Sequence, residues 1–585
     1  MNFFKTMFAS MLGTLLTILI IFLIAFGIIA GIIAAATVPE EKVEANSILK
    51  ITLDKKILDR EPGVPLLFDF NGTSKIYGMN DIIRNIKKAK TDNRIKGIYL
   101  DLTDIPAGIT TVAEIREALK DFKTSGKFIY AYSSMLSQKA YYLATVADKV
   151  YLHPEGGIMF KGLNSELMFL KGSLEKLDVK VQIIRHGKFK AATEPLFLDK
   201  MSPENRKQIT QMITNVWDDI LLGISESRGI SKADLNLYAD SLKVLAPADA
   251  YALHMVDSLI YMDQFLSILR TNLGIGETAD INEITLEKYL DVPATGKVNV
   301  AKDKIAVIYA QGDIVDGNGD DQNIGGDRFA KAVRKAREDK RVKAIVLRVN
   351  SGGGSALASD MILREIVLAN KEKPVVASFG DMAASGGYYI ACGARKILAE
   401  PTTLTGSIGV WAAIPNMQGL FNKKLGITFD NAMTNKNSDF VSVNKPLSPY
   451  QTAVLQKEIE NVYSTFVGHV SKGRNLTTAQ VDSIGQGRIW SGTDAKAIGL
   501  VDEFGGLTKA IETAASLANI KDYRLVALPE KKDPITELMN EFLGTQTRKS
   551  LMKELGEDYR YYEYLKDLRE IKGIQARLPF EMVLE

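Results

Sequence analysis

The chain has 585 residues and a net charge of +3, with 46% hydrophobic and 24% charged residues. This length exceeds what one hydrophobic core supports, so we expect at least two domains. The small net charge, without a basic run interleaved with aromatic residues, gives no support to a nucleic-acid partner. The single cysteine, Cys392, excludes an intrachain disulfide and a zinc site built from several cysteines. Its apolar neighbours indicate a buried structural thiol.

The N-terminal segment, residues 1–45, predicts one membrane-spanning helix over about residues 11–36. No charged residue occurs between Lys5 and Glu40. A helix over this stretch would rise about 39 Å, enough to cross a hydrocarbon core of about 30 Å. A cleaved signal peptide is the alternative, since Ala34–Ala36 offers small residues, but the apolar stretch is longer than usual for one. The few flanking charges favour a cytoplasmic N-terminus with the bulk of the chain outside.

Downstream of this segment the chain contains an internal repeat. In the alignment of the two copies, Ser385 stands opposite Gln138, and the glycine run Ser351–Ser355 stands opposite Asp104–Gly108. Only the later copy carries a serine and a triple glycine at these places, which predicts divided labour between the copies. Three pairs of segments carry the repeat: Asp92–Leu102 with Asp339–Val349, Tyr141–Ala144 with Tyr388–Ala391, and Leu245–Asp257 with Trp490–Asp502.

Short β-branched runs alternate with helical patterns in both copies. This alternation predicts an α/β fold of two tandem repeats with largely parallel sheets. We expect the first repeat at residues 46–292, opening with the strand Ser47–Leu53, and the second at residues 293–527, after a linker at Asp291–Asp303. In the second repeat we expect strands at Lys304–Ala310, Ala344–Val349, Pro374–Phe379 and Lys396–Ala399, and helices at Ala356–Ala369 and from near Ser385.

Two longer helices and a tail complete the expected elements. Ser202-Pro203 and Ser448-Pro449 predict helix starts at matching points of the copies, with serine at the N-cap and proline at the first helical position. The tail, residues 528–585, is charged, rich in tyrosine and not duplicated. We therefore expect it to be a packing or subunit-contact arm and not a catalytic part.

Ser385 is the candidate nucleophile, because it follows a predicted buried strand at the point where a helix begins. Free backbone N–H groups and the helix dipole at such a point favour a developing negative charge. Gly386 removes a side chain beside it, and Gly353 and Gly354 follow the neighbouring strand, so these turns could together form an oxyanion hole. Each glycine cluster alone is typical of a tight turn. Their joint absence from the first copy favours a function.

A serine nucleophile requires a base, and the four histidines fit that role poorly. His469 lies on a predicted helix, and His254 stands opposite Gly499 in the repeat. His153 and His186 belong to the first copy, and only His186 lies near a loop of interest. A Ser-His-Asp triad is therefore poorly supported, with His186 as the weak alternative.

Lys190 is the stronger candidate for the base. It lies in the segment His186–Pro195, after a predicted strand, and the second copy has no lysine at the matching place. Most lysines are solvated surface charges, but apolar neighbours such as Phe189 would bury this one. To act near neutral pH its pKa would have to fall from about 10.4 to about 7–8, which desolvation can supply. Ser407 offers a hydroxyl that could orient the amine.

Five motifs of the chain resemble the signal peptide peptidase A (protease IV) family in its long, duplicated, membrane-anchored form: Lys188–Pro195, Arg348–Ser355, Ala383–Ile390, Leu404–Val410 and Gly499–Gly506. The resemblance implies a Ser-Lys dyad, with Ser385 as nucleophile, Lys190 as general base and Ser407 as the serine that positions the lysine. It places oxyanion glycines at Gly353 and Gly354, to which the neighbour of the nucleophile, Gly386, adds a third candidate. One departure is Gly352, where the family usually has proline.

The resemblance further implies ClpP/crotonase-like repeats, a homotetramer and a catalytic domain on the outer, periplasmic face of the cytoplasmic (inner) membrane. Its substrates would be peptides, above all signal peptides left over after their release from preproteins, and the dyad needs no metal or organic cofactor. Two other functions stay open: a crotonase-type acyl-CoA enzyme and a non-catalytic membrane scaffold. The stretch Asp316–Asp327 has oxygens at alternating positions but lacks the glycine and glutamate of a calcium loop, which favours an ordinary polar loop.

Overall fold

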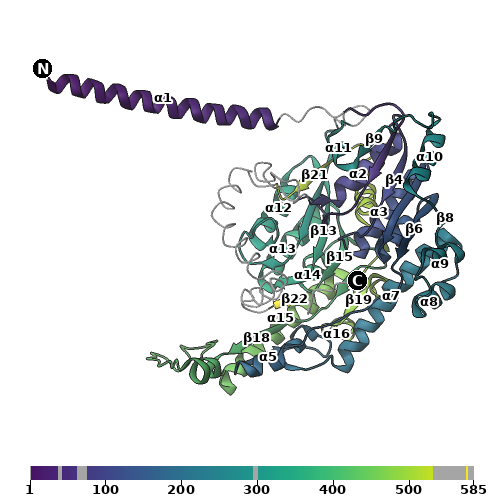
Figure 1. Ribbon diagram of the computed structural model, residues 1–585. Coiled ribbons are helices and arrows are strands. Elements are labelled where there is room, and N and C mark those ends of the chain that lie inside the picture. The colour runs from purple at the N-terminus through teal and green to yellow at the C-terminus, as the bar shows by residue number, and fades with distance from the viewer. Residues whose placement is uncertain (1, 37–41, 62–75, 294–300, 531–574, 578–585) are drawn as a thin grey trace.

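The computed structural model describes residues 2–36, 42–61, 76–293, 301–530 and 575–577 of the chain. Its first helix, α1 (Asn2–Ala36), projects away from the body of the protein (Figure 1). The window Phe3–Ile24 is long and apolar enough to cross a membrane, and it packs against nothing in the chain. The predicted span, residues 11–36, lies within this helix, which begins earlier.

The first repeat forms a six-stranded sheet in the order β8-β6-β5-β4-β1-β9. Every pairing in it is parallel, as the alternation of strands and helices predicts. The elements of this repeat are β1 (Ser47–Ile51), β2 (Ile57–Leu58), β3 (Tyr77–Gly78), α2 (Met79–Thr91), β4 (Ile95–Asp101), α3 (Ile109–Lys123), β5 (Phe128–Leu136), α4 (Gln138–Ala144), β6 (Lys149–Ile158), α5 (Lys171–Lys176), β7 (Lys180–Arg185), η1 (Ala191–Thr193), α6 (Glu194–Phe197), α7 (Pro203–Arg228), α8 (Lys232–Asp240), α9 (Pro247–Ala252), β8 (Ser258–Leu259), α10 (Met262–Leu273), β9 (Glu283–Thr285) and α11 (Leu286–Asp291).

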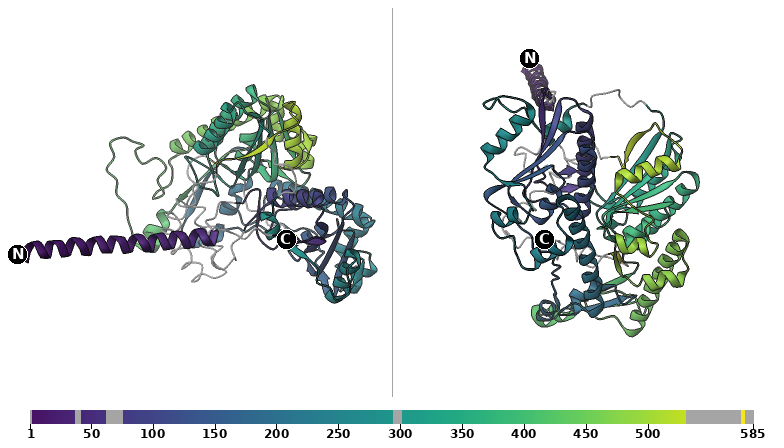
Figure 2. Two further views of the ribbon diagram at one scale, coloured as in Figure 1. Left: turned by 90° about the horizontal axis from the view of Figure 1, so that it is seen from above. Right: turned by 90° about the vertical axis from the view of Figure 1, so that its right-hand side faces the viewer.

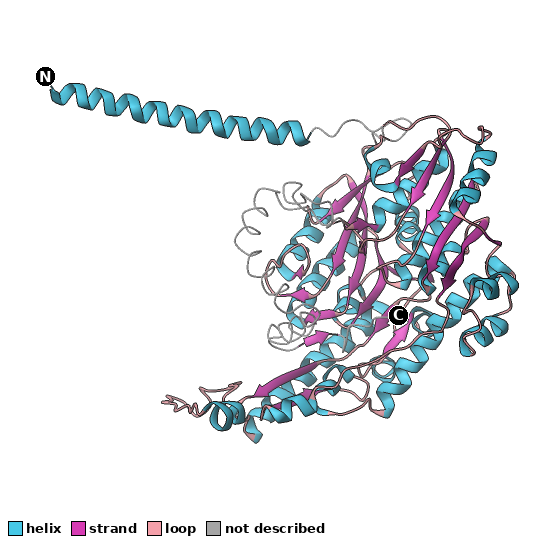
Figure 3. Ribbon diagram, in the orientation of Figure 1, coloured by secondary structure: helices cyan, strands magenta, loops and turns pink. Residues whose placement is uncertain are grey.

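The second repeat forms an eight-stranded sheet built on the order β19-β17-β15-β13-β10-β21, with β16 and β20 beside β15. Figure 3 shows the strands of both sheets with helices around them. The elements are β10 (Lys304–Gln311), β11 (Ile314–Val315), β12 (Ile324–Gly325), α12 (Gly326–Glu338), β13 (Val342–Ser351), β14 (Gly353–Ser355), α13 (Ala356–Glu372), β15 (Val375–Ala384), α14 (Gly386–Ala391), β16 (Lys396–Ala399), β17 (Leu404–Gly406), β18 (Trp411–Asn416), η2 (Leu420–Leu425), α15 (Pro449–Arg474), α16 (Thr478–Ile484), β19 (Ile489–Ser491), α17 (Gly492–Ala497), β20 (Glu503–Phe504), α18 (Leu507–Leu517), β21 (Arg524–Leu528) and β22 (Gln575–Arg577).

The expected elements agree with these bounds to within a few residues, with one larger difference. The strand expected to end at Phe379 continues as β15 to Ala384, because its last residues pair with a second strand, β17. The matching helices α7 and α15 each have 26 residues. They begin after Ser202 and Ser448, whose side chains accept hydrogen bonds from the backbone as predicted.

Two predicted boundaries lie at the edge of what the structure describes. Residues 294–300 of the expected linker, and residues 531–574 and 578–585 of the expected tail, lie outside the described residues. The second sheet reaches Leu528 through β21, one residue into the predicted tail. Gln575–Arg577 of that tail forms the strand β22, where the sequence pattern favours helix.

A third sheet joins the two repeats. Its order is β12-β11-β14-β22-β18-β7, so that β7 of the first repeat pairs antiparallel with β18 of the second. Arg185, the last residue of β7, lies opposite Trp411, the first residue of β18. The chain just after Arg185 and the chain just before Trp411 therefore run close together.

Apolar packing holds the two repeats face to face. One hydrophobic cluster contains Ile83 and Ile115 from helices of the first repeat together with Val307 and Val346 from strands of the second. The two repeats lie side by side, the first in purple to teal and the second in green to yellow (Figure 2). The interface is thus part of a continuous core, and the repeats form one packed body.

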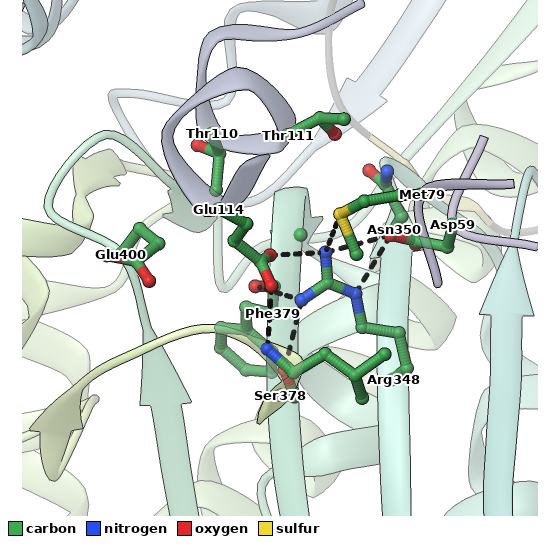
Figure 4. A network of polar contacts seen from close by, with 12 residues as sticks. Asp59, Met79, Thr110, Thr111, Glu114, Arg348, Asn350, Ser378, Phe379 and Glu400 are labelled. Atoms are coloured by element: carbon green, nitrogen blue, oxygen red, sulfur yellow. Dashed lines mark hydrogen bonds and ion pairs between the residues drawn. The ribbon is translucent and has the colours of Figure 1, made fainter. Parts of the chain in front are cut away.

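A buried ion cluster lies within this interface. Arg348, on the central strand β13, is fully buried and pairs with Asp59 at 2.8 Å and Glu114 at 2.6 Å, both from the first repeat (Figure 4). Its guanidinium also donates to Ser378 Oγ on the next strand, β15. Burial lowers the pKa of Arg348, but the two carboxylates outweigh it and hold the pKa above its ordinary value.

Two further carboxyl groups lie close to this cluster. Asp381 accepts hydrogen bonds from the backbone and side chain of Thr111, at the start of α3 in the first repeat. Burial raises the pKa of Asp381, and it raises the pKa of Glu400 to about 8 with a contribution from Glu114. Glu400 therefore carries a proton over much of the neutral range, which limits the negative charge that Arg348 has to balance.

Replacing Arg348 with methionine would leave Asp59 and Glu114 buried without their cation. Such a loss costs about 3–5 kcal/mol of unfolding free energy. We expect Arg348→Met to lower the Tm of the full chain in detergent by on the order of 10 °C. Arg84→Met is the control, because Arg84 pairs with Asp81 at the surface with 67% of its side chain exposed, and it should shift the Tm by about 2 °C or less. Equal Tm values for the two variants would contradict a stabilising role of the cluster.

Candidate active site

The structure brings together the three side chains that the sequence singled out. Nζ of Lys190 lies 2.8 Å from Oγ of Ser385 and 3.0 Å from Oγ of Ser407. It also lies 3.3 Å from the carbonyl oxygen of Ser407. All three residues are fully buried. The amine of the first repeat thus lies between two hydroxyls of the second, within hydrogen-bond distance of both.

Ser385 is held at a sharp strand-to-helix turn. It lies between the end of β15 and the start of α14, with φ of 55° and ψ of −114°, a conformation that costs free energy for any residue other than glycine. Its backbone N–H donates to Gly406 of β17, and its carbonyl accepts from Tyr389 in α14. The turn fixes the direction of the side chain and places Oγ next to the lysine.

Lys190 is held from several sides by backbone groups. Its carbonyl accepts a hydrogen bond from Arg185, and the preceding residue, Phe189, donates through its N–H to Gln486 of the second repeat. Gln208, on α7, donates to the carbonyl of Phe189 and accepts from the N–H of Ile489. One side chain of the first repeat thereby ties the lysine loop to a strand of the second.

The amine of Lys190 is in a site that favours its neutral form. Burial alone lowers its pKa well below the ordinary value of 10.5. Glu194, the buried acidic residue of the same loop, is instead bound by Ser202 and Asn205. Among the described residues no carboxylate forms an ion pair with Nζ of Lys190. A lysine in this setting is uncharged near neutral pH and can accept a proton.

Two glycines that the sequence analysis passed over make room for Lys190. Gly487 has φ of +81°, and a Cβ there would lie 2.5 Å from Cβ of Lys190 and 2.6 Å from its Cα. A Cβ on Gly409 would lie 3.2 Å from Cδ of the lysine. Gly485-Gln486-Gly487 has the composition of a tight turn, but nothing in the sequence indicates that its backbone lies against Lys190.

Ser407 has the geometry of a positioning residue. Its φ of 48° and the φ of 78° at Gly406 form a turn directly after β17. Its N–H donates to the carbonyl of Arg488, and its Oγ lies 3.4 Å from the carbonyl of Gly487. The hydroxyl is therefore directed at Lys190 by a backbone that is itself held on both sides.

The two glycine clusters lie next to each other, beside the nucleophile. Gly353 and Gly354 have φ of +104° and +154°, which favour glycine. A Cβ on Gly353 would lie 2.6 Å from the backbone nitrogen of Gly386 and 2.0 Å from the carbonyl oxygen of Ala576. The N–H of Gly353 donates to Oγ of Ser351. The arrangement brings the predicted oxyanion glycines together, and their role in stabilising charge stays a prediction.

The histidines lie with other partners. Nδ1 of His186 is 2.6 Å from Oε2 of Glu460, and its ring stacks on Tyr463. Nε2 of His469 is 3.1 Å from Asp360. Within the described chain, the hydrogen-bond partners of Oγ of Ser385 are the lysine amine and the carbonyl of Gly409, and no histidine is among them.

The matching position in the first copy has a structural use. Gln138, opposite Ser385 in the repeat, accepts hydrogen bonds from the N–H groups of Lys161 and Gly162 and donates to the carbonyl of Gly162. It fastens a loop that follows β6. The copy that provides Lys190 therefore has a loop clamp in place of a nucleophile.

The loop predicted not to bind calcium has a local structural role. In Asp316–Asp327, Asp316 accepts a hydrogen bond from Ser355, at the N-cap of α13, and β12 lies within the loop. Among the described residues no group of three or more histidine, cysteine or acidic side chains is arranged to hold a metal ion.

Comparison with known sequences identifies related proteins over most of the chain. The profile described as Peptidase family S49 matches residues 121–275 and 368–521, one stretch in each repeat. Protease 4 of Haemophilus influenzae is 38% identical over 75% of this chain and 73% of its own length. The chloroplastic serine protease SPPA of Arabidopsis thaliana is 32% identical over 92% of this chain and 78% of its own length. A putative signal peptide peptidase SppA of Enterococcus faecium is 33% identical over 45% of this chain and 75% of its own length.

Solved structures align only loosely with the whole chain. A ClpP1 mutant from Listeria monocytogenes aligns with a TM-score of 0.24 and 15% identity, over 35% of this chain and 94% of its own. A mutant of the 1510-N membrane-bound stomatin-specific protease aligns with a TM-score of 0.26 and 15% identity, over 40% of this chain and 100% of its own.

The lowered pKa of Lys190 predicts how stability depends on pH. The unfolded chain holds this proton up to about pH 10.5, whereas the folded chain has lost it well below that value. Between the two pKa values the unfolded state binds one more proton, so this group makes wild-type stability rise with pH by about 1.4 kcal/mol per unit. Lys190→Met removes that dependence.

We therefore expect Lys190→Met to melt at a higher temperature than the wild type at pH 7, with the gap narrowing toward pH 10.5. Thermal unfolding of the full chain in detergent at several pH values measures it. Lys188→Met is the control, since Lys188 is exposed, and its curve should run parallel to that of the wild type. A parallel curve for Lys190→Met would show that the buried amine keeps its proton.

Proposed function

The chain belongs to peptidase family S49 and is a serine peptidase, and from that premise we propose that Ser385 is its nucleophile and Lys190 its general base. The observation that carries the proposal is the 2.8 Å separation of Nζ of Lys190 from Oγ of Ser385 in a fully buried site. Lysine pKa depression by burial supports the same roles, because a base must be uncharged before it accepts a proton.

In the proposed reaction the neutral amine of Lys190 takes the proton of Ser385, and Oγ attacks a peptide carbonyl carbon. Backbone N–H groups of the glycine turns at Gly353, Gly354 and Gly386 stabilise the oxyanion. The lysinium then gives its proton to the leaving amine, and an acyl-enzyme remains. Water, deprotonated by the same lysine, hydrolyses the ester and restores the serine. Ser407 keeps the amine in line with Oγ throughout.

We extend the proposal to the substrate and the setting. The substrates are peptides, above all signal peptides left after release from preproteins, a class that the name of the Enterococcus faecium relative carries. Helix α1 anchors the chain in the cytoplasmic membrane, with the catalytic repeats on its outer, periplasmic face. Four chains assemble into a homotetramer, as the resemblance in the five motifs implies.

Substitution of the dyad tests the assignment. Ser385→Ala and Lys190→Met should each lower kcat/KM for a fluorogenic peptide by at least about a thousandfold, because each removes a group that bonds or protonates in the transition state. Ser385→Ala should also lose labelling by a fluorophosphonate. His186→Ala is the control and should keep activity within about tenfold. Turnover retained in Lys190→Met, or lost in His186→Ala with the fold intact, would overturn the base assignment.

The pH dependence of kcat/KM gives a separate test. Only the deprotonated lysine is active, so the rate should rise with pH through the lowered pKa of Lys190 and level off well below pH 10.5. The rising limb should be unchanged in His186→Ala. If His186→Ala shifts or removes the limb, the group that titrates is the histidine and the lysine assignment fails.

A further inference from the structure

One strand lies in the third sheet between two others that belong to the site. β22 (Gln575–Arg577) pairs antiparallel with β14, where Gly354 lies opposite Ala576, and on its other side with β18, where Trp411 lies opposite Gln575. β14 is also paired with β11, and β18 with β7. The gap between β14 and β18 is therefore one strand wide, with backbone hydrogen-bonding groups on both edges.

This strand reaches the reaction centre. The carbonyl oxygen of Ala576 lies against Gly353, where a built Cβ would be 2.0 Å from it, and against Gly386, where a built Cβ would be 3.0 Å from it. Gly386 directly follows Ser385, and Ala576 is fully buried. A backbone carbonyl of the chain itself therefore lies beside the glycines that the proposed mechanism assigns to the substrate oxyanion.

The contacts of the strand are few and local. Arg577 pairs with Asp313 at 2.7 Å, with 28% and 40% of the two side chains exposed. The indole nitrogen of Trp411 donates to the carbonyl of Arg577. In sequence the strand is separated from β21 by residues 531–574, and it contributes one fully buried side chain. A three-residue strand held by a part-exposed ion pair is weakly held compared with the central strands of either sheet.

We propose that the gap between β14 and β18 is a binding site for an extended peptide strand, and that Gln575–Arg577 is a resident strand that a substrate displaces. The proposal rests on the peptidase function proposed above. A substrate would add its backbone to the edges of β14 and β18, antiparallel to β14, with the carbonyl to be attacked where that of Ala576 lies. Strand addition provides main-chain hydrogen bonds independent of side chains, which suits an enzyme that receives peptides of varied sequence.

Charge reversal at Arg577 tests the competition. Arg577→Glu places two negative side chains together and should release the strand. We expect the KM for a neutral fluorogenic peptide to fall by about three- to tenfold with kcat unchanged. Asp313→Lys should do the same, and the double variant, which restores an ion pair in the opposite sense, should return to the wild-type KM. Arg84→Glu, a reversal in a surface pair away from the site, is the control.

The assay uses the full chain in detergent, and intact mass confirms that every variant keeps residue 577. A lower KM in both single variants and its restoration in the double variant support the proposal. An unchanged or raised KM in the single variants overturns it, because the strand then does not compete with peptide.

A second measurement does not depend on catalysis. In the full chain with Ser385→Ala, saturating peptide should displace the strand, and amide hydrogen exchange at Gln575–Arg577 should speed up at least about tenfold. Protection that persists with peptide bound, or absence of peptide binding, overturns the proposal. If exchange rises but no variant turns over peptide or reacts with a fluorophosphonate, the strand site stands and the dyad assignment fails.

Discussion

The structure depends on delivering one uncharged amine to a buried serine in another repeat. Lys190 is carried to Ser385 by the pairing of β7 with β18, which sets the chain after Arg185 beside the chain before Trp411. A charged ammonium would need a carboxylate there or water, and the site provides neither kind of contact within the described chain. Burial therefore selects the form of the lysine that can accept a proton, at a cost in stability that the surrounding core has to offset.

The duplication explains how such a site can be both buried and stable. A single repeat would have to bury its own lysine and serine at one sheet edge, whereas two repeats bury the pair between them. Gln138 shows the consequence for the first copy, where the position of the nucleophile has become a clamp for a loop. Each copy retains the strand and helix order, while the reacting groups are divided between them.

The sequence predicts most elements and the three central side chains, because these depend on local pattern. Ser385 follows a buried strand, Lys190 lies in an apolar loop, and helix caps such as Ser202 are visible as residue types. What could not be predicted are pairings between distant segments. Nothing local indicates that Asp59 lies against Arg348, that Gly487 lies behind Lys190, or that three tail residues enter a sheet. Each of these depends on long-range packing.

The buried ion cluster and the reacting groups lie on the same two strands. Arg348 is on β13, which leads to the glycine turn of β14, and it donates to Ser378 on β15, which leads to Ser385. Beyond Ser378 the side chain of Asn350 accepts from the N–H of Met382, a second link between the strands. Because Asp59 and Glu114 hold Arg348 from the first repeat, the repeat that carries the lysine also fixes the two strands that carry the nucleophile and the glycines. One interface thus determines both the position of the base and the geometry of the groups on which it acts.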